Sequence, residues 1–384
     1  MNIGLDYRPA LKPNSRHRGV GRYTDRLTRA LLRLETRHRF VLYTLTNDAI
    51  SLSGSFKIRP IFHLRRPSRL GWLTDTLLLP RRVRADELDV FHVTDPLVVP
   101  DCPGCRVVVS IHDLIPYIFW KETSARVPAD FRFALKRAWR KMRGADLVVT
   151  HSEHSKLDIC RMLSMDAAKV HVVPPGSTLQ PRAFDSDKAR ALFERFEISD
   201  GFLLYVGGTD YRKNLPRLVD AFRGIRRSGY RGALVMVGET FTWDIPEVIE
   251  LKGIASECGV SDHIRYLGYV PDEDLSLLYA GCDFFFFPSL YEGFGLPVLE
   301  AMQCGAPLLL SHASSIPEVA GDAAFYFDPE DVEAMIGSFA LAVSEPDLVD
   351  RKRQQARERA RRFTWEEVAG RMMALYESGF GGRG

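Results

Sequence analysis

Four consecutive phenylalanines, Phe284 to Phe287, strongly limit what this chain can fold into. A strand with apolar side chains on both faces is typical of a parallel sheet that helices cover on each side. A loop containing Gly293 and Gly295 follows, and then a helix that Pro297 suits at its start and Gly305 at its end. The sequence therefore predicts an α/β fold with this loop at the carboxyl edge of the sheet, where open α/β sheets bind ligands.

Short apolar runs alternate with helical patterns in both halves of the chain. This alternation predicts two doubly wound, Rossmann-like units with parallel sheets. In the first half we expect strands at residues 1–7, 39–44, 90–92, 107–112, 147–152 and 170–173, and helices ending near 34 and at 130–143 and 155–162. In the second half we expect a helix at 188–196 and strands at 202–206, 233–237, 263–266, 283–287, 307–311 and 324–327.

The length of the chain favours two domains, because 384 residues are too many for one ordinary core. Pro174, Pro175 and Gly176 end the first half, and residues 177–181 are interpreted as a linker. We expect an N-terminal domain over residues 1–180 and a second domain over 181–362.

Composition is that of a globular protein, with 46% hydrophobic and 26% charged residues. No apolar run reaches the roughly 18 residues that span a bilayer, and the first residues, MNIGLDYRPA, do not form a signal peptide. We therefore expect a cytoplasmic protein.

The six cysteines of the chain are scattered as in a reduced chain. Cys102 and Cys105 form a C-x2-C pair, but a zinc site would need a second pair.

Charge is divided unevenly between the halves. Residues 1–180 carry a net charge of +13, and the remainder carries −10. A basic half suits a membrane surface, a nucleic acid or an anionic acceptor. Because the chain contains no finger spacing, RNP-type motif or recognition-helix pattern, we do not expect nucleic-acid binding.

Two cations, Arg212 and Lys213, lie in the segment YVGGTDYRKNL, after a predicted strand and just before a helix. Paired cations at a helix start suit a diphosphate, since the charges add to the field of the helix end. A solvated basic turn is the alternative interpretation.

Two glutamates, Glu292 and Glu300, are separated by seven residues across the glycine loop and the helix start. With the flanking segments PSLYEGFGLPVLEAMQCGAP and SSIPEVAGDAAFYFDP, this pattern resembles the E-x7-E signature of the retaining GT4 glycosyltransferases. The resemblance extends from Gly19 to about Trp365. It implies the GT-B fold, in which two Rossmann-like domains face each other across a cleft. It also implies that a C-terminal helix, about 363–384, crosses back to the N-terminal, acceptor-side domain.

The same resemblance implies a role for individual residues of the second, donor-binding domain. Glu292 contacts the donor sugar, Glu300 holds the ribose hydroxyls, and Arg212 and Lys213 bind the diphosphate. Many relatives carry an arginine where this chain has Gly208, and we interpret Arg212 as supplying that charge. The remaining expected donor contacts are Phe294, Gly295 and Leu296 at the helix start, and Tyr269 and Val270 beside the base.

The first domain contributes a glycine loop and a histidine to the expected site. Gly19 and Gly21, in RGVGRYTDRL, match the family's N-terminal glycine loop, which approaches donor phosphates or acceptor. His112, at the end of an expected strand, matches the histidine beside the transferred sugar. Without the resemblance, a structural role for this histidine is the simpler interpretation.

The expected chemistry requires stabilisation of the diphosphate that leaves as the sugar becomes oxocarbenium-like. Arg212, Lys213 and the amides near Gly295 can supply it, so we expect no metal and no cofactor. Two D-x-D strings, at 185–187 and 272–274, lie beside predicted helix starts and are interpreted as helix caps. The resemblance suggests that the configuration of the sugar is retained.

Two other classes of function remain open at this point. Glu292 and Glu300 could be the acid and nucleophile of a glycoside hydrolase, although a hydrolase has no use for a phosphate site. The chain could also be a nucleotide-sugar binding module without activity. Turnover of a nucleotide-sugar with an acceptor separates these alternatives.

Donor and acceptor are predicted from finer resemblance. Three segments are most similar to bacterial mannosyltransferases of O-antigen and exopolysaccharide synthesis that use GDP-mannose: YRKNL, SLYEGFGLPVLEAM and SSIPEVAGDAA. The alternative donors are UDP-glucose, UDP-N-acetylglucosamine and dTDP-rhamnose. Residues 65–84, RRPSRLGWLTDTLLLPRRVR, place arginines around Trp72 and leucines. Such a basic amphipathic segment suits an anionic membrane surface, or else a core-packed helix with solvated arginines. We therefore expect a lipid-linked glycan acceptor and peripheral binding at the inner face of the cytoplasmic membrane.

Overall fold

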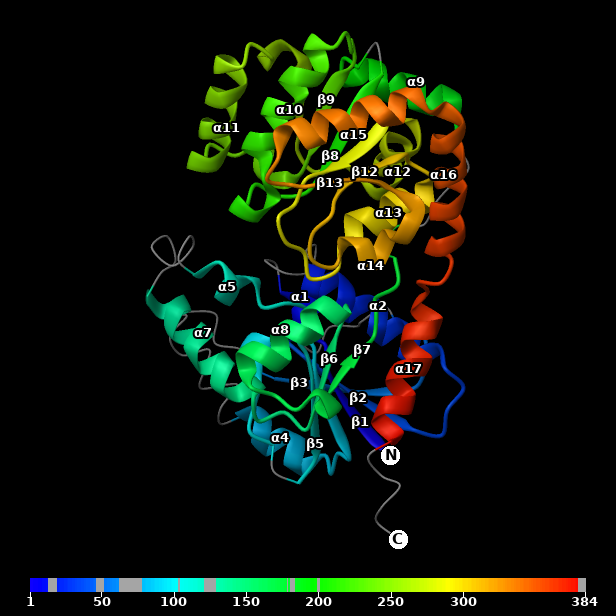
Figure 1. The fold of residues 1–384 in the computed structure, drawn as a ribbon. Helices are drawn as coiled ribbons and strands as arrows, with labels where there is room; N and C mark the ends of the chain where they lie inside the picture. Colours follow the sequence, from blue (N-terminus) through cyan, green and yellow to red (C-terminus); the bar gives the residue numbers. More distant parts are fainter. Residues whose placement is uncertain are drawn as a thin grey trace. The chain divides into compact units, whose positions relative to one another are not determined.

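The computed structural model describes residues 1–12, 19–45, 52–61, 78–102, 104–120, 129–177, 179, 184–198 and 201–378, with residues 129–131 described by their backbone. The chain divides into two compact units (Figure 1). One consists of Met1–Thr178 together with Phe363–Gly384, and the other of Leu179–Arg362. Each unit contains one parallel sheet with helices, so the predicted α/β class with two Rossmann-like units is confirmed.

The first unit is built on a seven-stranded sheet in the order β3-β2-β1-β4-β5-β6-β7. Every neighbouring pair of these strands is parallel. The strands are β1 (Asn2–Asp6), β2 (Arg39–Thr44), β3 (Phe56–Pro60), β4 (Val90–Val93), β5 (Arg106–Ser110), β6 (Leu147–Thr150) and β7 (Val170–Val172). The helices are α1 (Arg8–Leu11), α2 (Gly19–Arg33), α4 (Leu79–Ala85), α5 (Ile115–Ile118), α7 (Ala129–Met142), α8 (Glu153–Leu163) and α17 (Trp365–Glu377).

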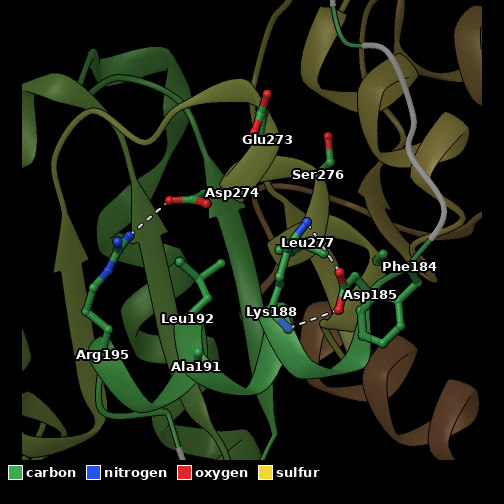
Figure 2. A pocket seen from close by; sticks show the side chains of 11 residues that line it. Phe184, Asp185, Lys188, Ala191, Leu192, Arg195, Glu273, Asp274, Ser276 and Leu277 are labelled. Atoms are coloured by element: carbon green, nitrogen blue, oxygen red, sulfur yellow. Dashed lines mark hydrogen bonds and ion pairs between the residues drawn. The ribbon is translucent and has the colours of Figure 1, made fainter.

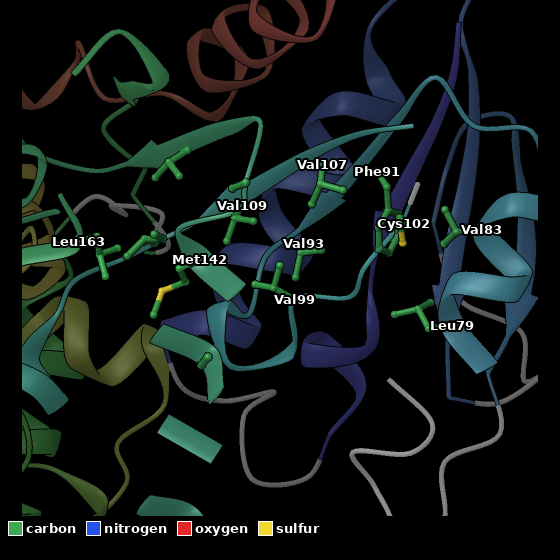
Figure 3. Packing of buried hydrophobic residues seen from close by; sticks show 14 of the residues in the cluster. Leu79, Val83, Phe91, Val93, Val99, Cys102, Val107, Val109, Met142 and Leu163 are labelled. Carbon is green, nitrogen blue, oxygen red and sulfur yellow. The ribbon is translucent and has the colours of Figure 1, made fainter. Parts of the chain in front are cut away.

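Helices cover both faces of this first sheet. On one face, Val83 of α4, Met142 of α7 and Leu163 of α8 pack against strand residues such as Val107 and Val109 (Figure 3). On the other face, α2 and α17 join strand residues in a second buried cluster. The C-terminal helix α17 is therefore part of the core of this unit, although it follows the whole second unit in the sequence.

The second unit is built on a six-stranded sheet in the order β10-β9-β8-β11-β12-β13, again parallel throughout. The strands are β8 (Phe202–Val206), β9 (Ala233–Val237), β10 (Ile264–Leu267), β11 (Phe284–Phe287), β12 (Leu308–Ser311) and β13 (Phe325–Phe327). The helices are α9 (Ser186–Arg195), α10 (Leu215–Arg227), α11 (Pro246–Glu257), α12 (Asp272–Gly281), α13 (Leu296–Cys304), α14 (Ile316–Ala320), α15 (Val332–Ser344) and α16 (Pro346–Ala360).

The four phenylalanines form β11 and are buried on both faces, as predicted. Phe285 contacts Tyr279 of α12, and Phe284 contacts Phe339 of α15, at ring-centroid distances of 5.4 and 5.7 Å. Adjacent strand residues point to opposite faces, so these contacts show that helices cover both sides of the strand.

One strand of the first sheet was not predicted. β3 lies at the sheet edge and is only partly buried, and its Lys57 and Arg59 pair with Asp86. Its charged, half-exposed residues therefore hide the apolar pattern that reveals the central strands. Two expected strands are also shorter than predicted, since β5 ends at Ser110 and β6 at Thr150. Among the described helices, none is long and apolar enough to cross a bilayer.

Candidate active site

The strand order of the second sheet reverses between β8 and β11. β9 and β10 extend the sheet from β8 in one direction, and β12 and β13 extend it from β11 in the other. The connections that leave the carboxyl ends of β8 and β11 therefore diverge, and ligands of doubly wound sheets bind at such a switch point. Arg212 and Lys213 follow β8, and Glu292 follows β11.

These three side chains form a buried ion cluster, which we call the Arg212–Lys213–Glu292 triad. Arg212 Nη1 donates to Glu292 Oε2 over 2.7 Å, and Lys213 Nζ donates to Glu292 Oε1 over 2.6 Å. Lys213 is 5% exposed and Glu292 7%. The ammonium of Lys213 also lies 4.9 Å from the ring centroid of Phe287 in β11, within range of a cation–π interaction.

The charges of the triad control each other's protonation. Burial by itself raises the pKa of Glu292, but the charges of Arg212 and Lys213 outweigh it and bring the pKa to about 2. Burial lowers the pKa of Lys213, and the carboxylate of Glu292 opposes this effect. Within the triad two cations face one carboxylate, and the exposed Asp210 adds a second carboxylate, with an oxygen 3.9 Å from Arg212 Nη2. Paired cations at this position suit an anionic ligand.

Asn214 fixes the position of the two cations. The chain after β8 forms a single 3-10 turn, Tyr211–Lys213, and Asn214 then adopts the left-handed conformation with φ of 60° before α10 begins. The buried Nδ2 of Asn214 donates to the carbonyl oxygens of Pro288 and Pro329, over 3.1 and 2.6 Å. This amide therefore ties the β8 connection to the connections after β11 and β13.

Two serines hold the loop that carries Glu292. The amide of Glu292 donates to Ser314 Oγ over 2.8 Å. Ser315 Oγ donates to the carbonyl oxygens of Glu292 and Phe294, over 2.9 and 3.0 Å. The position of the Glu292 carboxylate therefore depends on the serines that precede α14.

The helix after this loop begins and ends as predicted. Gly295 is in the left-handed conformation, with φ of 101°, immediately before α13, and Gly305, with φ of 74°, caps its end. Glu300 is buried within α13, and Tyr279 of α12 donates its hydroxyl to Glu300 Oε2 over 3.4 Å. The structure thus places Glu292 and Glu300 in different environments, one in an ion cluster and the other against a tyrosine.

The other expected donor contacts are spread along the same sheet edge. Phe294 is buried in the loop, and Leu296 is the first residue of α13. Tyr269 and Val270 follow β10, three strands from β11, where Tyr269 is 71% exposed and Val270 is buried.

The N-terminal glycines are not in a loop. Gly19 is the first residue of α2, and Gly21 is buried in the first turn of that helix. The expectation of a glycine loop at these two positions is therefore wrong; the residues just before them, 13–18, lie outside the described part of the chain.

His112 lies two residues beyond the end of β5 and is enclosed by polar partners. Its Nε2 is 2.8 Å from the carbonyl oxygen of Thr94, and its Nδ1 is 2.7 Å from Nε2 of His151. Burial lowers the pKa of His112, while the Thr94 carbonyl and nearby aspartates oppose this. Both ring nitrogens are thus engaged within the first unit.

The two D-x-D strings lie near a shallow groove of about 430 Å³ between α9 and α12 (Figure 2). Asp185 caps α9 by accepting from the amide of Lys188, as predicted. Asp272 and Asp274 lie within the first turn of α12, whose N-cap is Pro271, so the cap prediction is wrong for this string. Asp274 instead pairs with Arg195 over 3.0 Å.

The predicted basic segment, residues 65–84, lies mostly outside the described residues. The described part begins at Leu78 and continues as α4, where Leu79 and Val83 are buried and Arg81 and Arg82 are exposed. Leu79 and Val83 therefore pack in the core and the arginines of this part are exposed, while the membrane contact of the segment stays a prediction.

Residue patterns did not identify Asn214, Ser314, Ser315 or His151 as site residues. Each acts through another residue, and its partner is distant in sequence. The only local signal was the position of each residue at the end of a strand or the start of a helix.

Comparisons with known proteins agree with this geometry. A family model described as "Glycosyl transferases group 1" matches residues 191–363, and one described as "Glycosyltransferase Family 4" matches residues 17–180. The O-antigen chain mannosyltransferase B of Escherichia coli is 30% identical over 284 residues, which are 71% of this chain and 70% of that protein. The MMP alpha-(1->4)-mannosyltransferase of Mycolicibacterium hassiacum is 35% identical over 290 residues, 71% of this chain and 66% of that protein.

Other E. coli relatives are longer. The serotype-specific mannosyltransferase WbdA is 27% identical over 268 residues, which are 69% of this chain but 32% of that protein.

Solved structures share the fold over the whole chain. Sucrose-phosphate synthase from Thermosynechococcus elongatus has a TM-score of 0.74 at 20% identity, with all of both chains covered. HepE from Anabaena, in complex with UDP-glucose, has a TM-score of 0.73 at 17% identity and covers 98% of this chain and 99% of its own. The chain therefore belongs to the family 4 glycosyltransferases, has the GT-B fold, and is a glycosyltransferase enzyme.

Proposed function

We propose that the enzyme transfers mannose from GDP-mannose to a growing glycan, with retention of configuration and without a metal ion. The observation that carries this proposal is the Arg212–Lys213–Glu292 triad at the switch point of the second sheet, whose paired cations suit a sugar diphosphate. The names of the relatives favour mannose, since several are mannosyltransferases. UDP-glucose, UDP-N-acetylglucosamine and dTDP-rhamnose are the alternative donors.

The triad binds the donor as follows. Arg212 and Lys213 hold the diphosphate and stabilise the charge that develops on it as the bond to the sugar breaks. A carboxylate has about four acceptor positions, so Glu292 receives a sugar hydroxyl while it keeps both cations in place. Glu300 holds the ribose hydroxyls, and Tyr269 and Val270 lie beside the base.

The start of α13 adds a second source of positive potential. Helix N-termini present unpaired amides and the positive end of the helix dipole. Gly295 is in the left-handed conformation immediately before this helix, and in this proposal the amides around Phe294, Gly295 and Leu296 bind the donor. For Gly19, Gly21 and His112 of the first unit, the proposal keeps the donor-binding roles that the family resemblance implies.

A screen of GDP-, UDP- and dTDP-sugars tests the donor assignment. Release of the nucleoside diphosphate should be fastest with GDP-mannose, and Glu292→Gln should abolish it. Glu257→Gln, at an exposed position of α11, is the matched control and should behave as wild type. Faster release from another nucleotide-sugar would overturn the choice of mannose, and no release from any of them would overturn the proposed reaction.

Two further experiments test the stereochemistry and the metal independence. NMR of the isolated product reports the anomeric configuration, which should match that of the donor. Activity should persist in excess EDTA. Inversion of configuration, or loss of activity that Mg²⁺ or Mn²⁺ restores, would contradict the respective part of the proposal.

The acceptor in this proposal is a lipid-linked glycan, reached by peripheral binding of the N-terminal domain to the cytoplasmic membrane. α4 and α7 pack on the same face of the first sheet. Their exposed residues combine basic side chains, including Arg132, Lys136 and Arg140, with the apolar Leu78 and Phe133. Basic helices with isolated exposed apolar residues suit an anionic lipid surface.

Liposome sedimentation tests the membrane contact. Replacement of Arg81, Arg82, Lys136 and Arg140 by serine should abolish binding to vesicles that contain phosphatidylglycerol, and wild type should not bind neutral vesicles. Replacement by serine of four exposed arginines in or just after α16, namely Arg351, Arg357, Arg361 and Arg362, is the matched control. Equal binding by the two variants would contradict the contact.

A further inference from the structure

Cys102 and Cys105 lie in the turn that leads into β5, at the amino edge of the first sheet. Both are thiols and are not joined by a disulfide. Gly104, between them, has a φ of 98°, a left-handed conformation that glycine adopts readily. A turn brings residues i and i+3 within about 7 Å of each other. This separation is close to the span of a disulfide, about 4.4–6.8 Å between Cα atoms.

The side chain of Cys105 folds back toward Cys102. Its Sγ donates to the carbonyl oxygen of Cys102 over 3.6 Å. The two thiols also interact directly, and the hydrogen bond between them is the largest influence on the pKa of each. The two sulfur atoms therefore lie next to each other at the turn.

The two thiols differ in their access to solvent. Cys102 is 6% exposed and packs with Phe91 and Val83 in the buried cluster on one face of the sheet (Figure 3). Cys105 is partly exposed and packs against the edge of this cluster. A small molecule that arrives from solvent therefore meets Cys105 before Cys102.

The two thiols also differ in how readily they lose a proton. The hydrogen bond with the Cys102 thiol lowers the pKa of Cys105, while burial and the charge of Asp146 oppose this effect. The same contact, burial and the charge of Asp101 raise the pKa of Cys102, and Arg84 opposes them. Because the thiolate is the nucleophile in thiol chemistry, the more accessible sulfur is also the more reactive one.

A metal site is the alternative use of a C-x2-C pair. Structural zinc almost always takes four protein ligands. Within the part of the chain that the structure describes, no group of three or more His, Cys, Asp and Glu side chains could hold a metal ion. Two thiols do not complete such a site by themselves, whereas a disulfide needs no other group.

We propose that Cys102 and Cys105 are a redox-active dithiol, a modification site that low-molecular-weight disulfides convert into a reversible intramolecular disulfide. The thiolate of Cys105 attacks one sulfur of the small disulfide and forms a mixed disulfide, and the other half leaves as a thiolate. Cys102 then loses its proton and attacks the Cys105 sulfur, which releases the second half.

The two steps balance. The cysteine pair loses two electrons, and the small disulfide gains them and becomes two thiols, which take up the two protons of the pair. An excess of the small thiol therefore reverses the reaction and restores both cysteines.

This modification site is separate from the residues expected to meet the donor. Cys105 directly precedes the amino end of β5, whereas His112 lies beyond its carboxyl end. The proposal concerns the first unit alone and does not depend on the proposed function.

Single replacements test the assigned order of the two steps. Cys102→Ala leaves Cys105 reactive but removes the second thiol, so this variant should keep one glutathione on Cys105 after incubation with oxidised glutathione. Cys105→Ser leaves the buried thiol and should react more slowly. Cys258→Ser, at a partly exposed position of the second unit, is the matched control and should form the disulfide as wild type does. Faster reaction of Cys105→Ser than of Cys102→Ala would contradict the assigned order.

Thermal unfolding checks that Cys102→Ala is folded. If it is not, alkylation of the folded wild-type protein decides the same point, because a low dose of iodoacetamide should label Cys105 before Cys102. Equal labelling of the two thiols, or earlier labelling of Cys102, would contradict the assigned order.

Peptide mapping of the full-length wild-type protein tests the disulfide itself. The protein is equilibrated with mixtures of oxidised and reduced glutathione, quenched with acid, alkylated and digested. Trypsin releases residues 85–106 as one peptide, which contains Cys102 and Cys105 and no other cysteine. In oxidised glutathione this peptide should carry an internal disulfide, and in excess reduced glutathione it should be alkylated at both cysteines. A peptide that stays doubly alkylated in every mixture, or that carries glutathione without forming the internal disulfide, would overturn the proposal.

Discussion

Glu292→Gln offers the sharpest test of how the triad is held together. The substitution keeps the size and shape of the side chain and removes its charge, so Arg212 and Lys213 lose the carboxylate that both contact. Lys213 is buried, and burial of an ammonium without a counter-charge is costly. We therefore expect a less stable second unit.

The magnitude follows from the pKa of Glu292. A fall from the ordinary value of 4.5 to about 2 corresponds to about 3 kcal/mol of folding free energy. Because the side chain is 7% exposed, screening by solvent is small. The folded pKa lies below the unfolded one, so this stabilisation is present above about pH 4.5 and is lost as pH falls through about 2.

Urea unfolding followed by ¹⁹F NMR of 5-fluorotryptophan measures the free energy of unfolding of the second unit. Trp243 reports on this unit, since it is the one tryptophan between residues 179 and 362. Wild type and Glu292→Gln should differ by about 3 kcal/mol at pH 7, and the difference should shrink as pH is lowered from 5 toward 2. Glu257→Gln should match wild type throughout. A difference that is absent at pH 7, or that does not change with pH, would refute the reasoning.

The remaining predictions concern the residues that shape the site and its surroundings. Gly295→Ala places a side chain at a φ of 101° and should lower the urea stability by about 1–2 kcal/mol and weaken GDP-mannose binding in calorimetry; unchanged affinity would show that this turn does not shape the site. Asn214→Ala leaves the carbonyl oxygens of Pro288 and Pro329 without their amide donor and should cost about 2–4 kcal/mol in urea unfolding, whereas a loss below about 0.5 kcal/mol would contradict its anchoring role. Asp185→Ala removes the cap of α9 and should lower the urea midpoint, which Asp185→Asn should restore; equal losses in both variants would exclude capping as the cause.

Much of the second unit could be predicted because its strands are central and buried. The limits of β8 and β9 match the expected ranges, and α13 ends at Cys304 before a left-handed Gly305, as its sequence indicates. Strong local signals agree with the fold at each of these positions: a strand with apolar side chains on both faces, a proline at the helix start and a glycine at the helix end.

Other features could not be predicted from local patterns. β3 is an edge strand with charged residues, so its apolar periodicity is weak. Gly19 and Gly21 resemble a loop in sequence, but α2 includes both of them, because the rest of the helix buries its apolar face against the sheet and α17.

The candidate site was predicted in its members but not in its contacts. The spacing of Glu292 and Glu300 indicated two different roles, whereas the bonds from Arg212 and Lys213 to Glu292 join residues about 80 positions apart. The same holds for His112 and His151, which are 39 positions apart. Pairings of this kind depend on the sheet order, and no local pattern reveals them.

Calorimetric titration of GDP-mannose tests most directly the central claim that the triad binds a sugar diphosphate. Loss of one charge-assisted hydrogen bond should weaken binding to Lys213→Met by roughly 10- to 100-fold. Lys352→Met is the matched control. Lys352 also lies over a phenylalanine ring, 5.3 Å from its centroid, but this ring is at the amino end of β13. The Lys352→Met variant should therefore bind GDP-mannose as wild type does. Equal affinity of wild type and Lys213→Met, or no binding of GDP-mannose to the wild-type enzyme, would contradict the account.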